Sequence, residues 1–325
     1  MPFIKYFEKN TALDRPSNTK GVLYIDDNAN KSLGNVTRAT IDQSLMSSYK
    51  NRSAILDDVI VTANGRLYKN TQLIGEIIGC HSDDVFDTRI LDNKLFDYVI
   101  SISGVWTYGI WHFPTEALAA LMKCNIPDNA LIHVHSKTDY VLYWLSLIGI
   151  HKNRVIQGNI HTKKLFIPEL GVSGSPYPEQ IDWLSNLVKM SVKKTHNDLL
   201  IISKRTKTRV IRNYDDVYNK CKELAKAMNL TLYIHDDNKL PSIKKQHEAF
   251  KCAKILVAPH GGGNVNLLAM SEGTTFVEII DDKWPNKCFL RVAFHMNINY
   301  YGVSSKNWLA DINSLDNVFK KISNK

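Results

Sequence analysis

Short apolar runs alternate with helical patterns through the second half of the chain, and this alternation limits the fold more than any other feature. The runs are expected to be buried strands, because they are short and mainly apolar. The helical patterns include one that opens at Asp215 and one capped by Ser242. Because the connections are short, this half is expected to form a parallel α/β sheet. The expected strands span residues 199–202, 232–234, 255–258 and 275–280.

The first half alternates less regularly but contains segments of the same kinds. Strands are expected at residues 22–25, 59–61, 98–102 and 130–134, and helices at 114–122 and 139–149. A stretch rich in Gly, Ser and Pro precedes a long amphipathic segment at 178–194. With 325 residues, the chain is predicted to form two α/β domains, 1–175 and 197–325, joined by a hinge helix at 176–196. The last helix is a candidate to pack back on the first domain.

Charge and composition say little about partners. The chain has 41 basic and 32 acidic residues, a net charge of +9. A basic balance can serve nucleic acid, an anionic membrane or an anionic small substrate. Here no five like charges adjoin, and both Lys and Asn are abundant throughout, as an AT-rich coding sequence would produce. Nucleic acid is therefore the weakest of the partners considered, and none is expected.

Compartment and redox state follow from features that the chain lacks. No run approaches 18 apolar residues, so no transmembrane helix is expected. The first residues show no apolar signal region, which predicts a cytoplasmic location. The five cysteines are widely spaced and form no Cys-x-x-Cys pair, as is typical of reduced thiols rather than of disulfides or a zinc site.

A glycine-rich turn between the strand at 255–258 and the next helix is the strongest local signal. Glycines let the backbone approach a ligand closely, and the helix N-terminus offers unpaired amides to an anion. The alternative is a tight turn in which the glycines only relieve crowding. The spacing matches neither a Walker A loop nor a dinucleotide-binding motif. The candidate phosphate-binding residues of this turn are His260, Gly261, Gly262, Gly263, Asn264 and Asn266.

A basic cluster follows the strand at 199–202, where parallel sheets bind ligands. Three arginines fall within eight residues, and a guanidinium group pairs with phosphate oxygens at two points. A solvated basic loop is the alternative interpretation. The candidate residues for binding a diphosphate are Ser203, Arg205, Arg209 and Arg212.

An aromatic segment at 106–116 contains a third candidate. His112 and Glu116 are four residues apart at the expected start of a helix, so they share one face. A carboxylate beside an imidazole can provide a general base, and the aromatic rings can stack on a sugar or a base. The alternative is an aromatic core segment in which His112 and Glu116 only cap the helix.

The ordered set of motifs resembles glycosyltransferase family 61. Its members have a Ser-Arg segment, an Arg/Asn pair, a Gln-containing helix, a His-Gly-x-Gly turn and a strand with Glu. An upstream Tyr-His-Phe/Trp segment with an acidic residue precedes them. The matching positions, within residues 95–305, are Tyr108, His112, Phe113, Glu116, Ser203, Arg205, Arg212, Asn213, Gln246, His260, Gly261, Gly263, Asn266 and Glu278. The chain departs from the family pattern at Lys204, Ala258, Asn264 and Val265.

The resemblance implies an enzyme of the GT-B type, with two Rossmann-like domains whose parallel sheets face a central cleft. It implies an inverting reaction in which a nucleotide sugar, expected to be a UDP-sugar, reacts with a hydroxyl group of a glycan or protein-linked acceptor. Glu278 joins the donor-binding set through this resemblance. The base is either Glu116 or His112, and the resemblance does not choose between them.

No metal or other cofactor is expected. The chain has adjacent Asp pairs but no Asp-x-Asp motif of the kind that holds a divalent cation on a diphosphate. Arginines and helix amides can neutralise the leaving group instead. The alternative function, prompted by the departures at Lys204, Asn264 and Val265, is a degenerate module that binds a nucleotide or glycan without turnover.

Overall fold

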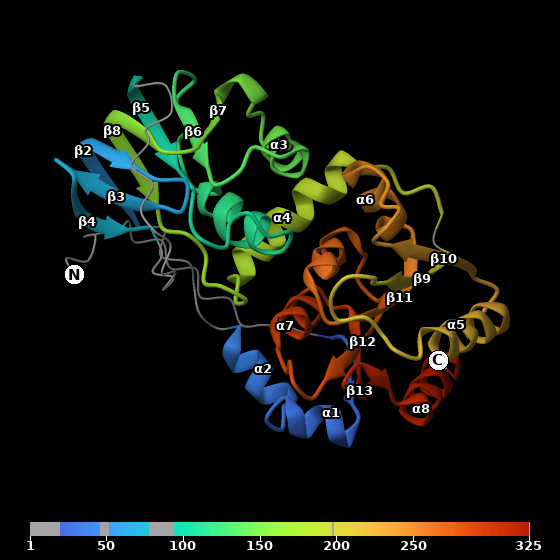
Figure 1. Cartoon of the computed structure of the whole chain (residues 1–325). Helices are drawn as coiled ribbons and strands as arrows, with labels where there is room; N and C mark the ends of the chain where they lie inside the picture. The colour runs from blue at the N-terminus through green and yellow to red at the C-terminus, as the bar shows by residue number, and fades with distance from the viewer. Residues whose placement is uncertain (1–19, 46–51, 78–93, 197, 325) are drawn as a thin grey trace. The chain divides into compact units, whose positions relative to one another are not determined.

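The computed structural model describes residues 20–45, 52–77, 94–196 and 198–324. Among them, the chain divides into two compact units, shown with their elements in Figure 1. The first unit contains residues 52–187, and the second contains residues 20–45 and 188–324. Helix α4 (Pro178–Ser191) spans the boundary between the two. No helix in the described ranges is both long and apolar enough to cross a membrane.

The second unit contains a parallel sheet, and the four strands predicted between residues 199 and 280 are confirmed. Strand β12 is buried at every position, as a strand covered on both faces must be. A short strand, β14 (Leu309–Ala310), pairs antiparallel with β13. The parallel strands, in spatial order, are β1 (Leu23–Ile25), β13 (Asn299–Lys306), β12 (Thr275–Asp281), β11 (Ala253–Pro259), β9 (Leu199–Lys204) and β10 (Thr231–Asp236).

The strand order creates a switch point beside β9. The chain passes from β9 to β10 on one side, and then returns to β11 on the other side of β9. At such a point the crossover connections leave in opposite directions, which opens a crevice outside the carboxyl ends of the two strands. The loops that follow β9 and β11 therefore occupy the part of this sheet best suited to a ligand.

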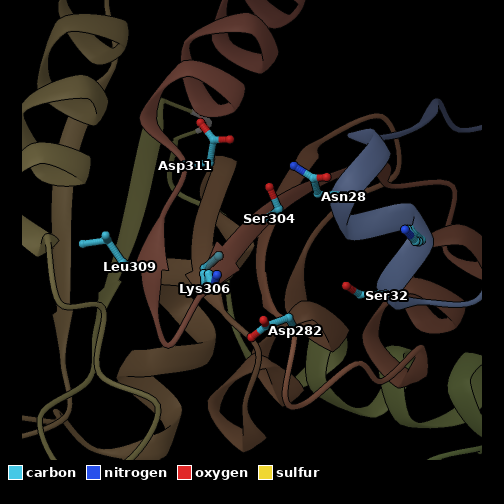
Figure 2. A pocket seen from close by; sticks show the side chains of 9 residues that line it. Asn28, Ser32, Asp282, Ser304, Lys306, Leu309 and Asp311 are labelled. Carbon is cyan, nitrogen blue, oxygen red and sulfur yellow. The ribbon is translucent and has the colours of Figure 1, made fainter.

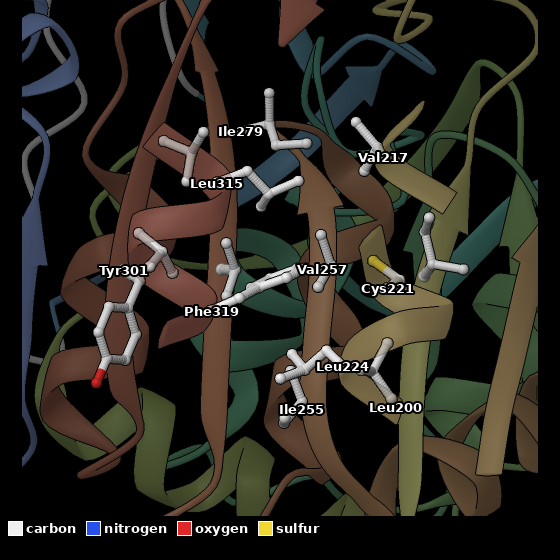
Figure 3. Close-up of a cluster of buried hydrophobic side chains, with 14 of the residues drawn as sticks. Leu200, Val217, Cys221, Leu224, Ile255, Val257, Ile279, Tyr301, Leu315 and Phe319 are labelled. Carbon is white, nitrogen blue, oxygen red and sulfur yellow. The ribbon is translucent and has the colours of Figure 1, made fainter. Parts of the chain in front are cut away.

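Helices connect the strands of the second unit. Helices α5 and α8 adjoin each other and bury the apolar side chains that Figure 3 shows, including Cys221, Leu224 and Phe319. The four described cysteines are free, which agrees with the prediction of reduced thiols; Cys80 lies outside the described residues. The helices are α5 (Tyr214–Ala227), α6 (Ile243–Lys251), η5 (Gly262–Ala269), α7 (Cys288–His295) and α8 (Ile312–Ser323).

Residues 20–45, which the sequence assigned to the first domain, belong to the second unit. Strand β1 extends the parallel sheet, with Leu23 in register with Tyr300. The Asp26 carboxylate accepts hydrogen bonds from the Ser304 amide at 2.6 Å and from the Ser314 hydroxyl at 2.5 Å. Two short helices follow, α1 (Asp27–Ser32) and α2 (Arg38–Ser44). The predicted first domain of 1–175 was wrong here, because an edge strand pairs across almost 280 residues of sequence.

The last helix packs in the core of the second unit. Helix α8 buries Leu315, Val318 and Phe319 in the core cluster of the second unit. Its apolar face is covered within the second unit, and packing of this helix on the first unit stays a prediction.

The first unit contains a mixed sheet rather than the parallel one expected. Strands β5 (Leu95–Ser101), β6 (Leu131–Val134), β7 (Val155–Gln157) and β8 (Ile160–Pro168) pair in parallel, in the order β8-β5-β6-β7. Strands β2 (Ser53–Val61), β3 (Arg66–Lys69) and β4 (Gln72–Glu76) continue from β8 antiparallel. Asn70 and Thr71, both with positive φ, form a two-residue hairpin turn, which permits antiparallel pairing only.

The helical segments of the first unit are short. The segment predicted as a helix at 114–122 forms one wide turn, η2 (Phe113–Ala117), and one tight turn, η3 (Leu118–Leu121). Helix α3 (Asp139–Ser146) matches the helix predicted at 139–149, and Thr138 caps it by accepting a hydrogen bond from the Val141 amide. A short turn, η4 (Lys152–Arg154), precedes β7.

Candidate active site

In the second unit, the basic segment after β9 and the glycine-rich turn after β11 meet at the switch point of the sheet. Arg205 directly follows β9, and His260 directly follows β11. The two strands are neighbours, with Ile202 in register with Val257. Sequence reasoning placed each segment after a strand, and the topology brings them together.

Gly261 is required for the contact between the two segments. A Cβ atom at position 261 would lie 1.6 Å from Arg205 Nη1 and 2.8 Å from its Cζ. The backbone of Gly261 is extended, so glycine is needed for the close approach rather than for its conformation. A Cβ at Gly263, in contrast, would meet no atom within 4 Å. The first glycine therefore seats a guanidinium group, and the third leaves open space beside the turn.

Two arginines converge on this turn without acidic partners. Arg205 Nη2 donates to Thr208 Oγ1 at 2.8 Å, while its buried Nε has no hydrogen-bond partner. Arg209 Nη1 lies 3.5 Å from the His260 carbonyl oxygen, and the guanidinium carbon lies 5.4 Å from the centre of the Trp284 ring. Within the described residues, neither guanidinium group forms a salt bridge. The pair thus provides positive charge for a ligand.

The electrostatics favour an anion at this position. Burial, and secondly the charge of Arg209, lower the pKa of the Arg205 guanidinium, although Asp237 acts in the opposite direction. A bound anion would offset both effects, because it stabilises the charged form. The loop is anchored by Thr206, whose amide donates to Asp237 Oδ2 at 3.1 Å. Arg209 has a φ of 55°, a left-handed conformation that non-glycine residues rarely adopt outside functional or tightly constrained positions.

His260 is held by two buried groups. Its Nδ1 lies 2.7 Å from Glu278 Oε1, and the Tyr300 hydroxyl donates to Glu278 Oε2 at 2.6 Å. Glu278 and Tyr300 are fully buried, so Glu278, a predicted donor-binding residue, faces His260 rather than solvent. Since Nδ1 faces the carboxylate, Nε2 is the ring nitrogen left for a ligand. Phe289 packs against the imidazole, with ring centres 4.9 Å apart.

Other predicted residues maintain the turn rather than enlarge the site. Asn264 Nδ2 donates to the Pro259 carbonyl at 3.1 Å, and Asn266 Nδ2 donates to the Gly263 carbonyl at 3.1 Å. Ser203 is half-buried near the end of β9, Gly262 is half-buried at the start of η5, and Arg212 is exposed. Among the described residues, the Arg212 side chain forms no hydrogen bond or ion pair with the other candidate residues.

His112 and Glu116 form a second histidine–glutamate pair, in the first unit. His112 Nδ1 lies 2.6 Å from Glu116 Oε1, which confirms that the two share a face. The Glu116 side chain is only 2% exposed, whereas that of His112 is 31% exposed. Glu116 is therefore shielded from any ligand, while the imidazole is accessible. The wide turn η2 creates this arrangement, and such turns are frequent at functional sites.

Several contributing residues were missed by sequence reasoning. Trp284, Phe289 and Tyr300 lie in segments with no motif, so only the fold could associate them with the arginines or with His260. A separate polar pocket of about 390 Å³ was also missed (Figure 2). It lies at the ends of β12 and β13 beside α1, and contains none of the predicted site residues. Its lining includes Lys31, Lys306, Asp282 and Asp311, with near-balanced charges.

The residues that the structure describes include no group of three His, Cys, Asp or Glu side chains placed to hold a metal ion. The predicted metal independence is not tested by this observation and stays a prediction.

The fold and site together define a class. A parallel sheet with arginines and a glycine turn at its switch point is typical of Rossmann-like proteins that bind phosphorylated ligands. The profile of the Glycosyltransferase 61 family matches residues 110–277, a little more than half of the chain. The chain therefore belongs to glycosyltransferase family 61, and this membership implies glycosyltransferase activity. Comparison with curated proteins gives no significant match.

Proposed function

We propose that the protein transfers a sugar with inversion from a UDP-sugar to a hydroxyl group of a glycan or protein-linked acceptor, without a metal ion. One observation carries the donor assignment: two guanidinium groups without acidic partners meet a glycine turn at the switch point of a parallel sheet. Family membership supplies the reaction class.

The diphosphate of the donor is assigned to the turn around His260. Arg205 and Arg209 neutralise the phosphate oxygens, and His260 Nε2 and the first amides of η5 add hydrogen bonds. As the bond between the anomeric carbon and the β-phosphate oxygen breaks, negative charge accumulates on the departing UDP. Groups fixed in advance around that charge stabilise the transition state more than they stabilise the substrate.

His112 is assigned as the base, and Glu116 as the residue that orients it. The acceptor hydroxyl transfers its proton to His112 Nε2 while its oxygen forms the new bond at the anomeric carbon. Glu116 accepts a hydrogen bond from Nδ1–H, which fixes the tautomer and stabilises the imidazolium that forms. The burial of Glu116 and the exposure of His112 support this order of roles.

The test combines binding with turnover in the full-length protein. UDP should raise the melting temperature, and the rise should persist in EDTA, because a ligand of the native state stabilises it. A rise that disappears with EDTA would contradict the metal-free assignment. A panel of UDP-sugars should then reveal one that is slowly hydrolysed. Binding of UDP without hydrolysis of any of them would favour the degenerate binding module.

A further inference from the structure

The loop between β5 and η2 exposes three large apolar side chains in a regular pattern. Trp106, Tyr108 and Ile110 are 45%, 53% and 49% exposed, respectively. The residues between and after them point inward: Thr107, Trp111 and Phe113 are at most 5% exposed. The segment is therefore not simply an aromatic piece of the core. Its buried members anchor the loop, and its exposed members form a patch that needs an explanation.

The loop is fixed by hydrogen bonds. Thr107 Oγ1 donates to the Gly104 carbonyl at 2.7 Å, and the Gly109 amide donates to the Trp106 carbonyl at 2.9 Å. The Tyr140 hydroxyl donates to the Ile110 carbonyl at 2.5 Å. A ligand that stacks on these rings would thus lose little binding energy to ordering of the loop.

One of the two exposed rings, that of Trp106, adjoins the proposed base. The ring of Trp106 lies 6.1 Å from that of His112, centre to centre, with 32° between their planes. The ring of Tyr108 lies 5.0 Å from that of His135. This spacing places a ring-sized ligand stacked on Trp106 within reach of the His112 imidazole.

The chemistry of the patch fits an uncharged sugar. Residues 104–111 contain no Asp, Glu, Lys or Arg, and the titratable rings shown against Trp106 and Tyr108 are those of His112 and His135, so the segment itself carries no formal charge. A pyranose has a face of C–H groups, which suits the electron-rich face of an aromatic ring, and hydroxyl groups around its edge. Stacking on the ring leaves those hydroxyl groups free to meet His112.

We propose that Trp106 and Tyr108 form the acceptor subsite and hold an uncharged pyranose at the end of a glycan, with one hydroxyl directed to His112. This inference rests on the proposed glycosyltransferase function, because it assigns the acceptor of that reaction. Trp106 and Tyr108 precede the part of the chain that matches the family profile.

The test is a glycan array probed with the full-length protein and saturating UDP. The wild type should bind a subset of glycans that end in uncharged pyranoses. Trp106→Ala should weaken this binding by about tenfold or more, and Trp106→Phe should retain most of it, because it keeps a ring. Ile55→Ala removes an equally exposed side chain of the same unit and should have no effect.

Each outcome has a separate meaning. Equal glycan binding by wild type and Trp106→Ala, or no glycan binding by the wild type, would overturn the subsite. The stabilisation by UDP and the hydrolysis of a UDP-sugar should be unchanged in Ile55→Ala, because Ile55 lies outside both proposed subsites. Loss of UDP binding in every protein, with glycan binding still dependent on Trp106, would refute the donor assignment and leave a sugar-binding patch.

Discussion

Replacing Gly261 with alanine places a methyl group where the Arg205 guanidinium lies. The new Cβ would be 1.6 Å from Arg205 Nη1, whereas ordinary contacts begin at 3.4 Å. The guanidinium must therefore move by about 2 Å, farther than a hydrogen bond to phosphate tolerates. A charge-assisted hydrogen bond contributes about 1.5–3 kcal/mol, so UDP should bind roughly 10- to 150-fold more weakly.

The fold should survive this change. The atoms displaced are the end of a flexible side chain, and the extended backbone at 261 accepts alanine. The free energy of unfolding should change by no more than about 1 kcal/mol. Isothermal titration with UDP measures the affinity, and urea unfolding measures the stability.

A double-mutant cycle identifies the cause. If Gly261→Ala acts by displacing Arg205, then adding it to Arg205→Ala should change UDP affinity by less than about 0.5 kcal/mol. UDP binding by Gly261→Ala at the wild-type level would refute the reasoning, since Arg205 would then have no role in holding the donor. Additive losses would mean that alanine at 261 blocks the ligand directly.

Three further predictions concern the turn, the base and the pH. Gly263→Val should abolish UDP binding with the fold intact, because the valine side chain enters the open space beside the turn. If the variant binds UDP with the wild-type affinity in the titration, the glycines only relieve crowding in the turn. His112→Ala should lower turnover by about 10²–10⁴-fold with UDP affinity retained, and Glu116→Gln by a smaller factor; a larger loss in Glu116→Gln would make Glu116 the base. Burial lowers the pKa of His133, His235 and His247 from the usual 6.5 to about 4. Below pH 6.5, the unfolded chain therefore binds more protons than the folded protein does. Stability in urea should be full above about pH 6.5 and fall toward pH 4, by up to about 1.4 kcal/mol per pH unit for each histidine, and a flat profile over that range would exclude buried neutral histidines.

The two histidine–glutamate pairs illustrate how a similar local arrangement arises in two ways. His112 and Glu116 are four residues apart, so one turn of the chain brings them together. His260 and Glu278 are 18 residues apart and meet because β11 and β12 are neighbouring parallel strands. In both pairs the carboxylate is buried and faces Nδ1, but the His112 side chain is 31% exposed whereas that of His260 is only 7% exposed. The proposed roles differ because the neighbours differ: Arg209 lies near the His260 carbonyl oxygen, and the exposed Trp106 ring adjoins His112.

The sequence determined the features that depend on near neighbours in the chain. Mainly apolar runs define β9, β11 and β12, because strands covered on both faces favour apolar side chains. The i, i+4 spacing of His112 and Glu116, the glycine turn after β11 and the family itself could likewise be inferred from residues alone.

Tertiary structure decided what depends on distant segments. Strand β1 joins β13 across almost 280 residues, and no local pattern records which edge a strand will extend. The contact of Arg205 with Gly261 requires β9 and β11 to be neighbours. The burial of Glu116 beside an accessible His112, and the burial of Trp111 in the same loop that exposes Trp106, depend on what packs against each side chain. Residue type and spacing indicate which chemical groups are available, but only packing determines which of them a substrate can reach.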